Sequence, residues 1–181
     1  MRKLGMTELG RKSVDDFKEA EKVPVVVVLD NIRSMHNVGS IFRSADGFLV
    51  SGIFLCGFTP RPPHRDIHKT ALGATETVDW KYFSTTAEAI ITLKQEGYRV
   101  VAVEQVEGGT SLENFVFSQK EKLALILGNE VEGVSDKALS LCDEGIEIPQ
   151  AGMKHSLNVS IAAGIVLWEM FKGYQLPGKN Q

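Results

Sequence analysis

An unbroken apolar run, PVVVVLD at residues 24–30, constrains the fold of this chain more than any other segment. A strand that is apolar at every position must be covered on both faces, as the strands of parallel sheets are. Further runs that predict strands lie at 52–57, 98–104, 123–128 and 145–149. Helical patterns alternate with them at 7–22, 37–49, 85–97, 134–142 and 156–173. We therefore expect an α/β fold, with a mostly parallel sheet flanked by helices.

The length of 181 residues suits one domain. We expect that domain at residues 24–175, after a short helical extension (1–23) and before a C-terminal tail (176–181). No apolar run approaches the roughly 20 residues that span a bilayer, and the first residues lack the apolar stretch of a secretory signal. Cys56 and Cys142 have no metal or redox spacing. Disulfide scaffolds, membrane spans and secreted modules are excluded, and we expect a cytoplasmic protein.

The charge is unevenly distributed along the chain. Residues 1–70 hold 11 Lys and Arg against 8 Asp and Glu (+3), and residues 71–181 hold 9 against 15 (−6), which together give the net charge of −3. The first part includes a Pro-rich basic loop at 58–70 that carries Arg61, Arg65 and Lys69. This part of the surface is suited to a phosphate backbone, although chance scatter of solvated charges explains the asymmetry equally well.

Three loops follow predicted strands, at 30–37, 128–133 and 149–156, where ligands bind in open α/β sheets. Asn37, at the end of the first loop, is placed as the N-cap of the helix that follows this loop. Arg43 is expected to lean back over the turn that contains Gly39, where the missing Cβ leaves room.

With Arg33 just outside that helix, the two arginines indicate a site for a phosphate or another anion. The structural alternative is that Arg33 and Arg43 pair with Asp30 and Asp46.

The second loop has the glycine spacing of a phosphate-binding P-loop, between Gly128 and Gly133, but Val134 replaces the required lysine. Glu130 and Glu132 would also repel a triphosphate, so a nucleotide triphosphatase is disfavoured.

In the third loop, Ser156 is a good N-cap, whereas Asn158 is poorly explained by helix propensity. His64 and His68 have helical spacing but no evident third ligand, so we expect no metal site.

Together the three loops resemble the SpoU/TrmH family of RNA ribose 2′-O-methyltransferases, in the SPOUT superfamily. The matching segments are DNIRSMHNVGSIFRSA (30–45), LILGNEVEGVS (125–135) and IEIPQAGMKHSLNVSIAAGIVLWE (146–169). The segment KTALGATETVDW (69–80) also looks like the family's sequence between the first two motifs. Three long motifs in the right order make the resemblance specific.

The resemblance implies a trefoil knot in the C-terminal third and S-adenosylmethionine as the cofactor. Gly128, Ile148 and Leu157 match family positions that contact the cofactor, and methyl transfer from a sulfonium needs no metal. Arg43 matches the proposed activator of the ribose hydroxyl, helped by residues that match Asn37, Glu130, Ser156 and Asn158.

The expected partners are RNA, either tRNA or rRNA, and a second copy of the chain that completes the active site. Arg33, Arg61, Arg65 and Lys69 are the candidate RNA contacts, and the last helix, apolar on nearly every side, fits a buried position in a homodimer. Two alternatives are a non-catalytic RNA-binding or assembly factor that keeps the fold, and a small-molecule methyltransferase.

Overall fold

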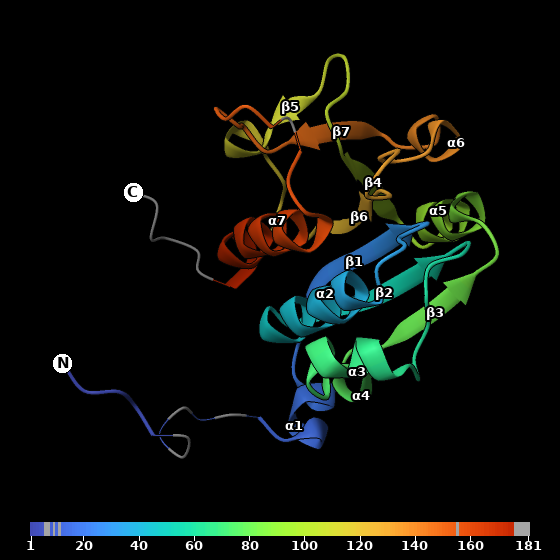
Figure 1. The fold of residues 1–181 in the computed structure, drawn as a ribbon. Helices are drawn as coiled ribbons and strands as arrows, with labels where there is room; N and C mark the ends of the chain where they lie inside the picture. The colour runs from blue at the N-terminus through green and yellow to red at the C-terminus, as the bar shows by residue number, and fades with distance from the viewer. Residues whose placement is uncertain (6–7, 9, 11, 155, 176–181) are drawn as a thin grey trace.

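The computed structural model describes the chain apart from residues 6–7, 9, 11, 155 and 176–181. Within the described residues, seven strands form one sheet in the order β3-β2-β1-β6-β4-β7-β5, and every neighbouring pair is parallel (Figure 1). The strands are β1 (Val23–Asp30), β2 (Val50–Cys56), β3 (Trp80–Phe83), β4 (Tyr98–Val103), β5 (Thr110–Ser111), β6 (Lys122–Leu127) and β7 (Glu144–Glu147). The predicted α/β fold with a mostly parallel sheet is confirmed.

The helices cover both faces of this sheet. They are α1 (Val14–Glu19), α2 (Met35–Gly47), α3 (Arg65–Ala71), α4 (Ala74–Thr77), α5 (Thr86–Gln95), the 3-10 helix η2 (Leu112–Asn114), α6 (Asp136–Leu139) and α7 (Val159–Gln175). Figure 1 shows α2 and α7 lying across one face.

The apolar run of β1 is buried on both sides, as expected for a central strand. Val25, Val27 and Leu29 pack in the core under α1, α2, α3, α4 and α7. Val26 and Val28 pack on the other face with residues of α5 and α6. Alternate residues of one strand therefore serve two separate cores.

Several elements differ from their predicted bounds. The basic segment 58–70 is not all loop, because α3 begins at Arg65. Its N-cap is His64, whose Nδ1 accepts a hydrogen bond from the Asp66 backbone at 3.2 Å. Strand β3 was missed because it is a four-residue edge strand with two exposed side chains in its middle, so it lacks an apolar pattern.

The ends of the chain match the prediction in part. A capping box of Ser13 and Asp16 begins α1, and the described helix there is only Val14–Glu19. The predicted helix at 7–22 extends onto residues 7, 9 and 11, which lie outside the described residues, as does the predicted tail at 176–181. No helix in the described part of the chain is long and apolar enough to cross a membrane.

Candidate active site

A cavity of about 690 Å³ opens at the carboxyl ends of β6, β4 and β7. It lies where ligands bind in open α/β sheets. Its lining includes six predicted site residues, which are Gly128, Glu130, Ile148, Ser156, Leu157 and Asn158. Two of the three predicted loops thus build it directly, together with the ends of three neighbouring strands.

Glu130 fastens the second loop to the first. Its Oε2 accepts a hydrogen bond from the Arg33 backbone at 2.9 Å, and its Oε1 accepts from the Ser34 backbone at 3.0 Å and from the Asn37 Nδ2 at 2.9 Å. The carboxylate therefore occupies the amino end of α2, where free N–H groups and the helix dipole favour an anion. The predicted anion site at this helix end is filled by a side chain of the protein itself.

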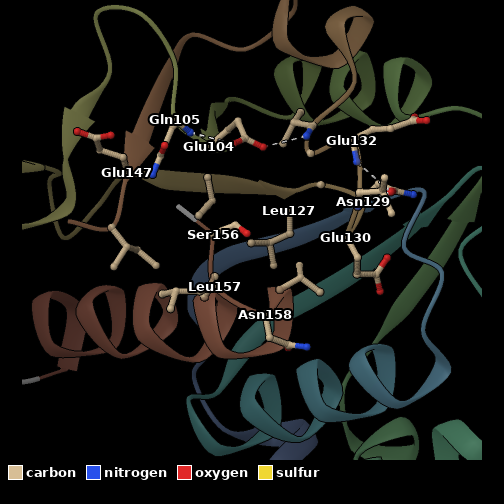
Figure 2. A pocket seen from close by; sticks show the side chains of 18 of the residues that line it. Glu104, Gln105, Leu127, Asn129, Glu130, Glu132, Glu147, Ser156, Leu157 and Asn158 are labelled. Atoms are coloured by element: carbon tan, nitrogen blue, oxygen red, sulfur yellow. Dashed lines mark hydrogen bonds between the residues drawn. The ribbon is translucent and has the colours of Figure 1, made fainter. Parts of the chain in front are cut away.

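The side-chain amide of Asn37 also connects α2 to the third loop. The Asn37 Oδ1 accepts a hydrogen bond from the Asn158 Nδ2 at 3.2 Å, and Figure 2 shows the side chains of Glu130 and Asn158 both directed toward α2. The Asn158 Oδ1 in turn accepts from the Ser160 backbone at 2.9 Å. A hydrogen-bonded chain of Glu130, Asn37 and Asn158 thus links all three predicted loops.

The hydrogen bonds to Glu130 set its ionisation. Burial acts to raise its pKa, but the backbone of Arg33, the amide of Asn37 and the backbone of Ser34 outweigh that effect, and the pKa lies below its ordinary value. Glu130 is accordingly an ionised hydrogen-bond acceptor at neutral pH. Its arrangement suits positioning of Asn37 better than removal of a proton from a substrate.

Two residues hold the first two loops together in a role that the sequence interpretation did not give them. Asp30 is 1% exposed and accepts hydrogen bonds from the Thr86 hydroxyl and from the Ser135 backbone, the latter at 2.8 Å. The Asn129 Nδ2 donates to the Asn31 carbonyl at 2.7 Å. Their signal in the sequence is a polar residue at the end of a buried strand or within two residues of it.

Glu104, at the end of β4, is a third missed residue of the cavity (Figure 2). Its Oε2 accepts a hydrogen bond from the Val134 backbone at 3.1 Å, which ties the second loop to β4. The same loop is closed by paired backbone hydrogen bonds between Asn129 and Gly133, each 2.9 Å long. A Cβ on Gly128 would lie 2.1 Å from the Val134 nitrogen, so this glycine is required by the closure of the loop.

The structure corrects three expectations about α2 and α7. Ser34, not Asn37, is the N-cap of α2, because the helix begins at Met35, three residues earlier than a cap at Asn37 predicts. Gly39 leaves no space for Arg43, since α3 packs there and a Cβ would meet the Thr70 hydroxyl at 2.1 Å. Likewise Ser156 does not cap α7, which begins at Val159.

Arg43 is exposed on α2 and is not among the residues that line the cavity. It lies six residues after Asn37, so the two side chains leave the helix about 120° apart. The alternative ion pairs are absent among the described residues. Asp46 accepts from the Thr77 hydroxyl, and Asp30 is bonded as stated above.

The other predicted RNA contacts lie outside this cavity. The guanidinium of Arg61 lies over the Tyr82 ring at 4.1 Å from its centroid, and Lys69 pairs with Asp66 at 2.8 Å. Arg65 lines a different cavity. In the described part of the chain, no group of three or more His, Cys, Asp or Glu side chains is placed to hold a metal ion.

The fold and the cavity together define an α/β protein with a ligand site at the carboxyl edge of a parallel sheet. The chain belongs to the SpoU rRNA Methylase family, whose model matches residues 24–168. This membership confirms the resemblance seen in the sequence.

Individual relatives agree with the family. A protein of Vibrio parahaemolyticus named 23S rRNA (guanosine-2′-O-)-methyltransferase RlmB is 31% identical over 162 residues, which cover 90% of this chain and 64% of that protein. The chain thus spans somewhat less than two thirds of that relative.

Solved structures show the same fold. An AdoMet-bound rRNA methyltransferase from Sinorhizobium meliloti is 30% identical, with a TM-score of 0.74 over 88% of this chain and 60% of that one. The TrmH/SpoU tRNA modifying enzyme of A. aeolicus has a TM-score of 0.80 at 24% identity, over 91% of this chain and 82% of that one.

Proposed function

We propose that this protein is an S-adenosylmethionine-dependent RNA methyltransferase that methylates a ribose 2′-hydroxyl of tRNA or rRNA in the cytoplasm, and that residues 24–175 form its methyltransferase domain. The observation that carries the proposal is the hydrogen-bonded chain of Glu130, Asn37 and Asn158 at the cavity. Family membership and the names of the relatives support it.

The cavity suits a cationic nucleoside such as S-adenosylmethionine. Its described lining contains five acidic residues and no basic one, the acids being Glu104, Glu130, Glu132, Asp136 and Glu147. Ile148 and Leu157 add apolar surface of the kind that packs against a purine, and Gly128 keeps the loop closed behind it. When bound, the cofactor supplies an activated methyl group on a positively charged sulfur.

The residues at the mouth of the cavity orient the ribose. Asn158 and Ser156 line the cavity, where Ser156 is exposed, and the Asn37 amide holds Asn158 in place. Arg43 binds the phosphate beside the target ribose and polarises the hydroxyl. A guanidinium keeps its proton at neutral pH and only donates hydrogen bonds, so this role is electrostatic.

A homodimer would bring Arg43 to the cavity of a second subunit. Leu157, which lines the cavity, begins a row of exposed apolar side chains that continues along α7 through Ile161, Ile165 and Trp168 (the α7 stripe), which are 39%, 55%, 36% and 43% exposed in that order. The opposite side of α7 is buried against the core. A second copy of the chain covers the α7 stripe, and its interface then borders the cavity.

The C-terminal knot is part of the same proposal. Strand β7 lies beside β4, whereas α7 packs on α2 and β1. We infer that the chain between them crosses the carboxyl ends of β4 and β6, where residues 128–135 form their loop. Passage through that loop makes the trefoil knot that the family resemblance implies.

Methyl incorporation tests the proposal. Purified protein is incubated with S-adenosylmethionine labelled in its methyl group and with RNA from a strain that lacks the gene. The RNA should become labelled, and RNA from the parent strain, already modified, should not. If the RNA binds but stays unlabelled, the protein is a non-catalytic RNA-binding factor and the proposal is wrong.

A further inference from the structure

A second cavity, of about 520 Å³, lies between α3, α4 and the start of β3. It shares no lining residue with the first cavity. The residues that matter here are Pro62, Pro63, Arg65, His68, Glu76 and Trp80. Its volume is within the range of about 300–1,000 Å³ that is typical of small-ligand sites.

A stripe of aromatic and cationic groups runs from this cavity along the edge strand β3. Trp80 and Tyr82 are two residues apart, so they lie on one face of the strand. Arg61 lies over the Tyr82 ring. Lys81 is on the opposite face, where its Nζ is 5.6 Å from the centroid of the Phe54 ring.

The stripe continues to the first loop of the candidate active site. The Tyr82 hydroxyl donates a hydrogen bond to the Gly57 carbonyl at 3.1 Å, and the next residue, Phe58, donates its backbone N–H to the Asn31 Oδ1 at 3.2 Å. Phe58 itself is 59% exposed, although the next residue, Thr59, is buried. Trp80 lies three residues before the end of β3, or about 10 Å at a rise of about 3.3 Å per residue.

Charged side chains of opposite sign lie around the second cavity. The Arg65 side chain is exposed and makes no hydrogen bond or ion pair with any described residue, so its guanidinium is available to an anion. Glu76 is the acidic residue of the lining, and its carboxylate would repel a phosphate but accept hydrogen bonds from base amino groups. Aromatic faces with nearby cations are the groups that bind single-stranded nucleic acid.

We infer that the second cavity holds an unpaired base of the RNA substrate, stacked on Trp80, with the adjoining phosphate on Arg65. The inference rests on the proposed function, because it takes RNA as the partner. The base belongs to a nucleotide a few positions from the target ribose, since the stripe connects the two sites.

Fluorescence provides the direct test, because Trp80 and Trp168 are the two tryptophans of the chain. The full-length protein is titrated with a single-stranded RNA oligonucleotide. Emission should be quenched in the wild type, and the quenching should be lost in Trp80→Phe, which retains Trp168 and an aromatic ring at position 80. Quenching that is unchanged in Trp80→Phe, or absent while the RNA is fully bound, would overturn the inference.

Affinity measurements add three variants, of which Arg65→Ala and Lys81→Ala are a matched pair of charge removals. Trp80→Leu should raise the RNA Kd roughly tenfold, the scale for one lost stacked base. Arg65→Ala should raise it several-fold and lower the salt dependence by about one counterion, whereas Lys81→Ala, on the opposite face, should stay within about twofold. Wild-type affinity in both Trp80→Leu and Arg65→Ala would overturn the inference.

The inference and the proposed function fail separately. Methyl transfer without quenching of Trp80 overturns the base site alone. Quenching of Trp80 without methyl transfer supports the base site and overturns the enzymatic proposal. Absence of RNA binding overturns both.

Discussion

Glu130 shows how much one side chain can organise. It lies 97 residues from the Arg33 N–H that it accepts from, and it accepts two further hydrogen bonds at the amino end of α2. An apparently repulsive acid in a glycine-containing loop is therefore the link between the first and second loops. A short-range pattern cannot reveal such a partner.

The lowered pKa of Glu130 makes the stability of this link depend on pH. Its contribution is complete above the unfolded pKa of about 4.3 and is lost as pH falls through the lower folded value. Glu130→Gln should lower the Tm at pH 7 by roughly 2–4 °C, the scale of about one net hydrogen bond. The difference from wild type should shrink below about pH 4. Glu132→Gln, in the same loop, is the control. A difference that stays constant from pH 7 to pH 3 would contradict the assignment.

Substitution of Arg43 tests its proposed electrostatic role at the target hydroxyl. Arg43→Ala should reduce the single-turnover methyl-transfer rate by roughly 10²-fold or more at saturating RNA, with cofactor affinity close to wild type. Arg43→Lys should restore little, because an ammonium lacks the planar fork of the guanidinium. A wild-type rate in Arg43→Ala would remove the residue from the mechanism.

Mixed dimers test whether Arg43 acts across the interface. Arg43→Ala and Asn158→Ala subunits, each inactive alone, should recover about a quarter of the wild-type activity when they are mixed, because half of the dimers are mixed and each has one intact site. No recovery would place Arg43 in the site of its own chain.

The loop after β6 is the element on which the cavity depends most. Gly128→Ala would place a methyl group within about 2.1 Å of the Gly133 and Val134 backbone, so the loop must open. We expect S-adenosylmethionine affinity to fall at least tenfold by calorimetry, with faster hydrogen exchange at 128–135. Gly47→Ala is the matched control, because nothing lies within 4 Å of its added Cβ. Normal binding by Gly128→Ala would place the cofactor elsewhere.

The α7 stripe predicts that the protein is a homodimer. Ile161→Asp should convert dimers to monomers in sedimentation at micromolar concentration, because a charge would be buried without a partner. The control is Ile91→Asp, at a similarly exposed isoleucine (48%) on α5, on the other face of the sheet. A wild-type protein that sediments as a monomer would contradict the dimer.

At the scale of the whole molecule, the sequence predicts the architecture better than it predicts the contacts between residues. Buried runs such as β1 and β6 carry a pattern that only a two-sided sheet satisfies, and the family motifs identify the loops. Strand β3 was missed because it is short and lies at the sheet edge, and helix α3 was missed because it is short and follows two prolines. The role of Gly39 depends on α3, which approaches from a distant segment, and the role of Gly128 depends on the closure of its own loop against Gly133 and Val134.

The position of the methyl group is the most direct test of the account. RNA methylated by the purified protein is digested to nucleosides and analysed by mass spectrometry. We predict a single added methyl on a ribose 2′-oxygen, so that the adjoining phosphodiester resists alkali. Reaction with Arg43→Ala should leave that nucleotide unmodified in a single turnover. A methyl group on a base, or no methyl group on RNA that is bound together with S-adenosylmethionine, would contradict the account.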